Sequence, residues 1–191
     1  MATSDVAICN SALQKLGASR ITSLAEDSEE ARQCSGCFEQ QREAELRKHT
    51  WNFAIARATL PAETYDPDFG PANSFALPSD FLRLLPVDPE DVTNTNDWRI
   101  EGRSIRTNDS APLYIRYIRR VEDPNEFDSL FADMLACRIA LQTCEKITGS
   151  NQKKAAVADE YKTAQREAKR VNAFENVAQE PPPDTWDTAR L

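Results

Sequence analysis

The sequence has little glycine and almost no histidine, and these scarcities exclude several common catalytic motifs. Its five glycines lie far apart along the chain. No two of them can share a phosphate-binding loop or a nucleophile elbow, which excludes the dinucleotide fingerprint, the P-loop and the G-x-S-x-G serine motif. His49 is the single histidine, so a zinc-binding helix or a multi-histidine metal site is excluded too. We therefore expect no catalytic residues, no cofactor and no metal, and a protein that acts through its surfaces.

Long apolar runs and an excess of positive charge are also missing. No apolar run approaches the ~18–20 residues that span a bilayer, and the N-terminus has no apolar signal core, so we expect a soluble protein. The 191 residues carry 23 Lys and Arg against 31 Asp and Glu, a net charge of −8. This balance argues against a protein that grips nucleic acid through its phosphates. The length suits one domain, or one domain with an insertion.

The five cysteines are an odd number, which indicates free thiols in a reducing compartment. Cys34 and Cys37 form a C-x-x-C pair, but the pair falls inside a predicted helix and has no second pair to complete a zinc site. Cys137 and Cys144 lie seven residues apart on one helix face. We interpret these cysteines, together with Cys9, as buried free thiols rather than redox or metal-binding residues.

Apolar residues recur at helical spacing in four segments, which predicts helices over about 4–17, 28–49, 124–148 and 151–177. Ser4 is the predicted N-cap of the first helix and Gly17 its C-terminal stop. Asp27 with Glu30 resembles a capping box for the second helix, and Asp123 with Pro124 one for the third.

The last predicted helix begins after Ser150 and carries a 4-3-4-3 apolar spacing. The residues in this seam are Val157, Tyr161, Ala164, Ala168 and Val171. Small residues at such a seam favour close antiparallel packing on the preceding helix. Residues 179–191 contain three consecutive prolines and are predicted to form an extended tail.

Proline punctuates the middle of the chain, where residues 59–112 hold seven of the eleven prolines. Helices cannot persist there, so we predict short strands over 53–60, 82–87, 98–101, 104–107 and 113–120, with a hairpin over 98–107. The predicted fold is therefore mainly α: a helical bundle with a long C-terminal αα-hairpin and a small inserted antiparallel β region over about 53–120. Residues 1–178 would form a single domain, followed by the tail.

Three groups of residues could carry chemistry, and each also has a structural interpretation. His49 could act as a general base, but no partner stands near it in the sequence, so packing or hydrogen bonding is favoured. The acidic residues Asp123, Glu126 and Asp128 could supply two carboxylates for glycan hydrolysis, whereas helix capping explains Asp123 and Glu126 without chemistry.

The third group is a basic and aromatic strand, in which Arg116, Arg119 and Arg120 alternate with Tyr114 and Tyr117. Such a strand could bind nucleic acid. The favoured interpretation is an edge strand whose arginines pair with the acidic turn at 122–123 or with acidic helices of a neighbouring copy.

Three segments, taken in order, resemble tail tubular protein A, the head-to-tail adaptor family of short-tailed and related bacteriophages. They are HTWNFA at 49–54, FALPSDFLR at 75–83, and YIRR at 117–120 followed by Asp123-Pro124 and FDSLF at 127–131. They lie between an N-terminal helix ending in Leu16-Gly17 and the C-terminal helical hairpin. The likeness covers about residues 4–175, and it depends on the order and spacing of the segments rather than on a catalytic motif.

The resemblance implies a structural protein of the virion tail or neck, made in the cytoplasm of a bacterial host. Such adaptors form a ring, usually twelvefold, that docks on the portal protein, extends the DNA channel and attaches the tail nozzle. Their C-terminal segment tends to reach the portal, which would assign portal binding to Pro181, Pro182, Pro183, Trp186 and Leu191. Genomic DNA would pass without specific binding. The alternatives are a tail-associated cell-wall glycan hydrolase or a small DNA-binding protein.

Overall fold

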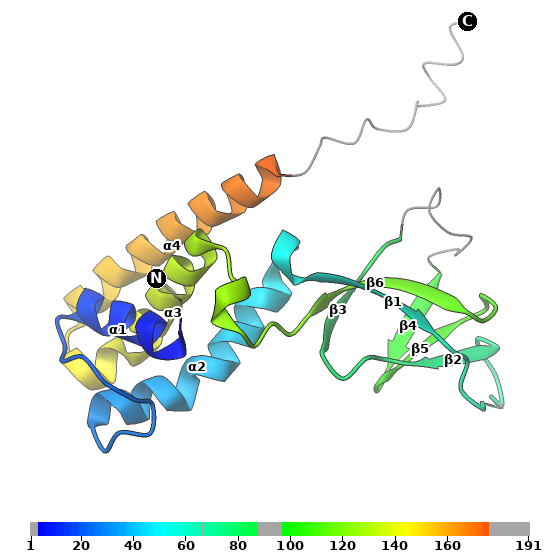
Figure 1. Cartoon of the computed structure of the whole chain (residues 1–191), viewed down its shortest axis with the longest axis horizontal. Coiled ribbons are helices and arrows are strands. Elements are labelled where there is room, and N and C mark those ends of the chain that lie inside the picture. Colours follow the sequence, from blue (N-terminus) through cyan, green and yellow to red (C-terminus); the bar gives the residue numbers. More distant parts are fainter. Residues whose placement is uncertain (1–3, 66, 88–96, 176–191) are drawn as a thin grey trace, which may run out of the picture.

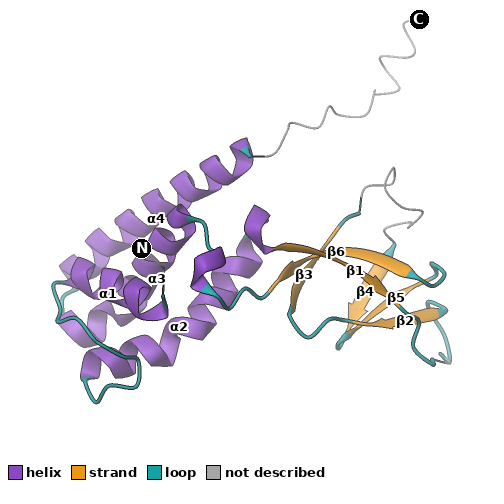
Figure 2. Cartoon of the chain, in the orientation of Figure 1, coloured by secondary structure: helices purple, strands orange, loops and turns teal. Residues whose placement is uncertain are grey.

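Helices gather at one end of the molecule and strands at the other in the computed structural model of the chain (Figures 1 and 2). The structure describes residues 4–65, 67–87 and 97–175. We call the two parts the helical lobe and the sheet lobe. The chain crosses from the helical lobe into the sheet lobe after α2 and returns before α3.

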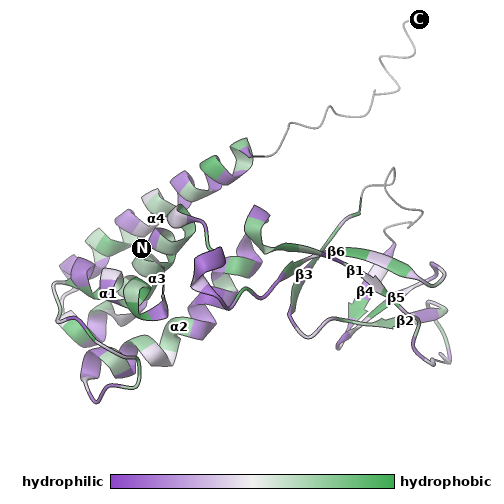
Figure 3. Cartoon of the chain, in the orientation of Figure 1, coloured by the Kyte–Doolittle hydropathy of each residue, from purple (hydrophilic) through white to green (hydrophobic). Residues whose placement is uncertain are grey.

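Four α-helices build the helical lobe: α1 (Asp5–Leu16), α2 (Glu29–Lys48), α3 (Ser129–Thr148) and α4 (Asn151–Phe174). Helix α3 packs against the other three, so it is the centre of this lobe. Most sides of α3 are buried, and its buried side chains include Phe131, Leu135 and Ile139. Helices α2 and α4 have many polar residues, as the hydropathy colours of Figure 3 show, and each buries a single stripe.

Local capping signals set most of the helix ends. The Ser4 and Ser150 side chains accept hydrogen bonds from the backbone N–H groups of Ala7 and Lys153, as predicted. Gly17 and Gly149 end α1 and α3 with φ of 76° and 61°, in the left-handed region that favours glycine. The cap of α2 is Ser28 rather than the predicted Asp27.

The predicted start of α3 is wrong by about one turn. Residues Pro124–Glu126 form a separate 3₁₀ turn, η2, and α3 begins at Ser129. Asp128 is its N-cap and accepts hydrogen bonds from the backbone of Leu130 and Phe131. Phe127 is extended between the two helices (φ −72°, ψ 139°), which breaks the helical run that the sequence pattern suggests.

Six short strands build the sheet lobe: β1 (Ile55–Leu60), β2 (Asn73–Ala76), β3 (Phe81–Leu85), β4 (Trp98–Glu101), β5 (Ser104–Thr107) and β6 (Leu113–Arg119). A 3₁₀ turn, η1 (Asn52–Ala54), precedes β1. The strands form two antiparallel three-stranded sheets, ordered β1-β6-β3 and β2-β5-β4. The predicted hairpin over 98–107 is present as β4 and β5, with Ile100 opposite Ile105. Strand β2 was not predicted.

The expectation of a mainly α fold with a small β insert is wrong. Helix accounts for 51% of the structure and strand for 19%, so the fold is mixed. The physical reason is that the sheets bury a core of their own. Inward-facing Leu113, Ile115 and Tyr117 of β6 pack with Phe75 and Ile105 of the other sheet. A second core lies in the helical lobe and continues into the sheet lobe through Leu82, Leu85 and Ile118.

Candidate functional site

The three segments that carry the family resemblance meet at the junction between the lobes. From the first segment come Trp51 and Phe53, and from the third come Phe127 and Phe131. Their rings form one aromatic cluster, in which Phe131 lies edge-on to Trp51 at 5.1 Å and to Phe53 at 5.0 Å between ring centroids. Phe127 closes the cluster at 5.1 Å from Phe131. Aromatic pairs at these distances add stabilisation beyond burial, so the cluster joins the helical lobe to the start of the sheet lobe.

The second resembling segment reaches the same junction through arginine and backbone contacts. The Arg83 guanidinium donates to the Thr50 hydroxyl at 2.8 Å, and Arg47 of α2 donates to the Leu82 carbonyl. On the return to the helices, the Tyr117 hydroxyl donates to the Asp80 carboxylate at 3.1 Å. The junction is thus held by an apolar centre with polar contacts around it. The sequence alone did not show that segments up to eighty residues apart converge here.

Asn172 of α4 holds the connecting segment between α2 and β1. Its Oδ1 accepts from the backbone N–H of Asn52 at 2.9 Å, and its Nδ2 donates to the Thr50 carbonyl at 2.9 Å. Asn52 donates in return to the Asn172 carbonyl at 2.9 Å. Asn172 is buried although the predicted seam favoured Val171, which is 36% exposed. The heptad spacing could not find this residue because it counts apolar positions only.

His49 ends α2 at this junction, as a packing and hydrogen-bonding residue. Its ring lies edge-on to Trp51 with 4.8 Å between centroids, and its Nε2 is 3.5 Å from the Asn172 amide nitrogen. Partial burial, followed by the nearby positive charges of Lys169 and Arg83, lowers the pKa of His49. These contacts are those of the packing and hydrogen-bonding role that the sequence favoured for His49.

A buried carboxylate, Glu45, ties α2 to α3 and α4 beside the junction. Its side chain is 1% exposed and accepts from Tyr161 at 2.9 Å and from Lys48 at 2.6 Å, with Arg138 at 3.5 Å. Burial and the Glu45 charge raise the pKa of Tyr161. A buried charge needs such partners to be tolerated. The spacing of apolar residues could not predict a buried position for Glu45, because a carboxylate is buried only where partners on other elements neutralise it.

The acidic residues that could have supported glycan hydrolysis are used structurally. Asp123 accepts from the backbone of Asn125 at 2.9 Å, so it caps the 3₁₀ turn. Glu126 pairs with Arg119 instead of bonding back to a helix start. Asp128 caps α3 through Leu130 at 2.8 Å. These contacts account for all three carboxylates without a substrate.

The arginine-bearing strand is not an edge strand, which corrects that expectation. Strand β6 is the central strand of its sheet, between β1 and β3. Its arginines find acids outside the predicted turn: Arg119 pairs with Glu126, and Arg120 lies 2.6 Å from Glu43 of α2. Arg116 stands opposite Arg57 of β1. Two of the three predicted cations are therefore neutralised within the chain.

The cysteines are free and buried, as predicted. All five are within the helical lobe core: Cys9, Cys34, Cys37, Cys137 and Cys144. Burial raises the pKa of Cys37 and of Cys137 to about 11. These two thiols stay protonated at neutral pH, so both behave as small apolar side chains.

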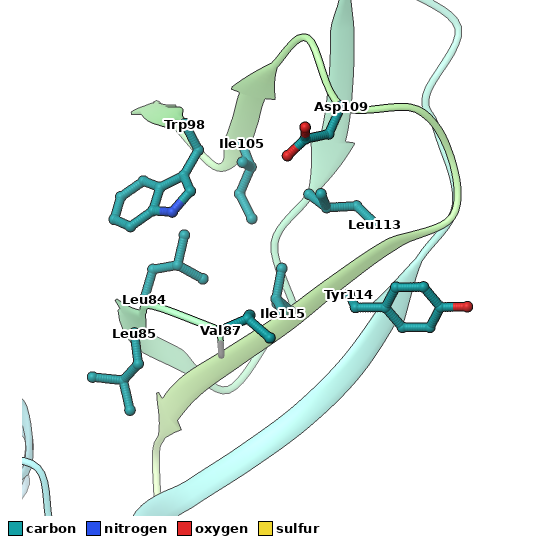
Figure 4. A pocket seen from close by; sticks show the side chains of 9 residues that line it. All are labelled: Leu84, Leu85, Val87, Trp98, Ile105, Asp109, Leu113, Tyr114 and Ile115. Atoms are coloured by element: carbon teal, nitrogen blue, oxygen red, sulfur yellow. The ribbon is translucent and has the colours of Figure 1, made fainter. Parts of the chain in front are cut away.

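The cavity between the two sheets is too small for a ligand. Its volume is about 10 Å³, on the scale of a single water molecule. Figure 4 shows Leu84, Trp98, Ile105 and Ile115 directed toward one another from both sheets. We interpret this cavity as the packing seam of the sheet lobe.

A wider hollow of about 350 Å³ lies on the outside of the sheet lobe. It is formed by the loop between β1 and β2 together with Arg99 and Glu101 of β4. Phe69 on this loop is 89% exposed. Beside it, the Arg106 guanidinium lies 3.8 Å from the centre of the Tyr65 ring. An open hollow with an exposed aromatic suits a protein partner better than an enclosed small molecule.

Two further kinds of site are missing from the described residues. In the ranges 4–65, 67–87 and 97–175, no group of three or more His, Cys, Asp or Glu side chains is arranged to hold a metal ion. No helix in those ranges is long and apolar enough to cross a bilayer. The predicted portal-binding residues Pro181, Pro182, Pro183, Trp186 and Leu191 lie outside the described residues.

Comparison with known proteins adds no family assignment. No protein-family model matches the chain, and no curated protein matches it with significance.

Proposed function

We propose that this chain is a structural protein of a bacteriophage virion, the head-to-tail adaptor. In this proposal, identical copies form a ring, a dodecamer, that docks on the portal protein and extends the DNA channel. The ring then offers an attachment surface to the tail nozzle or to the next tail protein. Genomic DNA passes through the ring without specific binding.

The convergence of the three resembling segments is the observation that carries the proposal. The segments at 49–54, 75–83 and 117–131 were selected by their order in the sequence. In three dimensions they share one junction, through Trp51, Phe53 and Phe131 and through the Arg83–Thr50 hydrogen bond. Segments that are distant in the sequence but share one packed junction form a single structural unit, which is what the resemblance requires of them. The junction therefore supports the proposal that the three segments together mark the adaptor fold.

The occupied polar groups also support a structural protein over the two alternatives. Asp123, Glu126 and Asp128, the candidate carboxylates for glycan hydrolysis, are engaged as caps or in an ion pair. Arg119 and Arg120, candidates for DNA contact, face carboxylates of the same chain. The net charge of −8 would repel DNA rather than hold it, which suits a channel that DNA must traverse.

The proposal assigns one partner to the sheet lobe and another to the C-terminal residues of the sequence. The outer hollow beside Phe69 would receive the next tail component, because its exposed aromatic ring offers a contact point that a protein partner can bury. The C-terminal residues 179–191, with Trp186 as the aromatic anchor, would bind the portal.

The test is to mix the purified full chain with the portal ring of its own phage and to examine the mixture by electron microscopy and light scattering. A stoichiometric ring of this chain on the portal is expected. A variant that lacks residues 179–191 should keep its helical circular dichroism signal and its melting temperature but fail to dock. Phe69→Ala is the matched control, since it should still dock on the portal and instead weaken attachment of the next tail component. A folded, full-length chain that never docks would refute the proposal.

A further inference from the structure

The outward face of α4 is basic in a chain that is acidic overall. The helix carries six Lys and Arg residues against three Asp and Glu residues, and it packs on α3 through one stripe. Three of its cations are exposed at a spacing of four residues, which places them in one row along the helix. We call this row the basic ridge: Lys162, Arg166 and Arg170.

Within the part of the chain that the structure describes, the basic ridge has few partners. Lys162 pairs with Asp159 at 3.1 Å. The Arg166 guanidinium donates within its own helix, to the Lys162 carbonyl and to the Thr163 hydroxyl, both at 3.4 Å. Among the described residues, no carboxylate lies within ion-pair distance of Arg166 or Arg170.

An exposed aromatic ring extends the ridge at its C-terminal end. Phe174 is 73% exposed, and the Arg170 guanidinium lies 5.5 Å from the centre of its ring. Val171 beside it is 36% exposed. Arginine next to a protruding aromatic residue is the composition that is enriched in protein–protein interfaces.

The opposite charge gathers at the other end of the helical lobe, in the turn that leads into α2 and in the first residues of that helix. We call it the acidic turn: Glu26, Asp27, Glu29 and Glu30. Arg32 pairs with Asp27 at 2.6 Å and with Glu29 at 3.2 Å, and the positive charge of Lys146 also acts on Glu29. Four carboxylates against these two cations leave an excess of negative charge. The Asp27 and Glu29 side chains are 97% and 54% exposed, so this end of the lobe carries carboxylates at its surface.

We propose that the basic ridge of one copy docks on the acidic turn of the next copy. The two surfaces lie at different ends of the helical lobe, the turn at the start of α2 and the ridge on the second half of α4 (Figure 1). They cannot satisfy each other within one chain. A contact between two different patches is heterologous. Repeated from copy to copy, it forms a ring when the rotation between copies closes and an open filament when it does not. This inference rests on the proposed function, for which it names the surfaces that join neighbours in the ring.

A second copy fits the ridge better than nucleic acid does. Asp159 and Glu167 lie among the cations of the same helix, so the positive stripe is short and interrupted. Phosphate-binding faces need a continuous basic stripe. Phe174 and Val171 at the end of the ridge offer apolar area that another copy can bury. A second copy also presents the acidic turn, whose charge is opposite to that of the basic ridge.

The test measures self-association of the full chain by sedimentation velocity over a range of concentrations at low salt. We expect oligomers that dissociate as salt is added. Reversing two ridge charges, Arg166→Glu with Arg170→Glu, should weaken association by about tenfold or more. Reversing the turn, Glu29→Lys with Glu30→Lys, should weaken it similarly, and combining both pairs should restore it. The matched control, Arg57→Glu with Arg103→Glu, makes the same charge change on exposed residues of the sheet lobe that lie outside the hollow beside Phe69, and it should have no effect.

Several outcomes would overturn this inference. It fails if the parent chain does not associate at low salt, if the reversals leave association unchanged, or if the combined variant is not restored. It also fails if the ridge reversal abolishes binding to a labelled DNA duplex but not self-association, which would assign the ridge to nucleic acid. The portal-docking experiment is read separately. If the ridge variant still docks on the portal as an unchanged ring, the proposed contact surfaces are wrong but the adaptor function stands. If the combined variant recovers self-association but the chain does not dock on the portal, the adaptor function is wrong but the contact surfaces stand.

Discussion

Replacing Phe131 with alanine should destabilise the whole molecule, because this residue is the centre of the lobe junction. Its side chain is 0% exposed and contacts three other rings, with centroids 5.0 to 5.1 Å away. A Phe→Ala change in a core costs about 3–5 kcal/mol through lost burial and the cavity that remains. The loss of three edge-on contacts favours the upper part of that range. At about 2–4 °C per kcal/mol for a chain of this length, the melting temperature should fall by roughly 8–20 °C.

The assay is chemical and thermal unfolding followed by circular dichroism at both far and near ultraviolet wavelengths. The near-ultraviolet signal arises from the packed aromatic side chains, Trp51 among them, so it should weaken along with stability. Phe69→Ala is the control: it removes the same side chain where it is 89% exposed, and the free energy of unfolding should stay within about 0.5 kcal/mol of the parent. If Phe131→Ala lost less than about 1 kcal/mol, the aromatic cluster would not be what joins the lobes.

Two further predictions concern polar groups near the junction. Glu45→Gln keeps the shape of the side chain but removes the charge that Lys48 and Arg138 face, so the free energy of unfolding in urea should fall by about 2 kcal/mol; an unchanged midpoint would contradict the role of the buried carboxylate. His49→Gln should make the protein less sensitive to acid. Because the pKa of His49 is lowered in the folded state, the unfolded chain binds a proton first as the pH falls below 6.5, and stability drops. Equal acid sensitivity of the variant and the parent would show that His49 does not contribute.

The helix ends that the sequence predicted well are those set by local chemistry. Ser4, Gly17, Gly149 and Ser150 act within their own turn, through one side-chain hydrogen bond or one left-handed backbone conformation. The predicted helix start was wrong where a tertiary contact determines the backbone conformation. Residues near Pro124 have good helix-start chemistry, yet the chain stays extended at Phe127, whose ring packs on Phe53 and Phe131.

The sheet lobe was underestimated because strand pairing is not local. Strand β2 has only four residues in a proline-rich stretch, and it is defined by its register with β5, where Phe75 stands opposite Ile105. No pattern in the neighbouring sequence predicts that Phe75 pairs with Ile105. The burial of Glu45 and Asn172, the polar residues of the junction, was not predicted for a related reason. Each is polar on a helix, and only its partners on other elements show that it belongs inside.

The pairing of β1 with β6 has a consequence for how the molecule could be re-engineered. Ile55 and Ile118 are register neighbours, so the chain leaves and re-enters the helical lobe at adjacent positions. Antiparallel partners lie about 5 Å apart, a gap that a very short linker can bridge. The sheet lobe is therefore an insertion that is joined to the helical lobe by two adjacent chain segments, one at Ile55 and one at Ile118. A different domain with similarly spaced ends could be grafted there without rerouting the helices, provided that it supplied apolar cover equivalent to Leu82, Leu85 and Ile118.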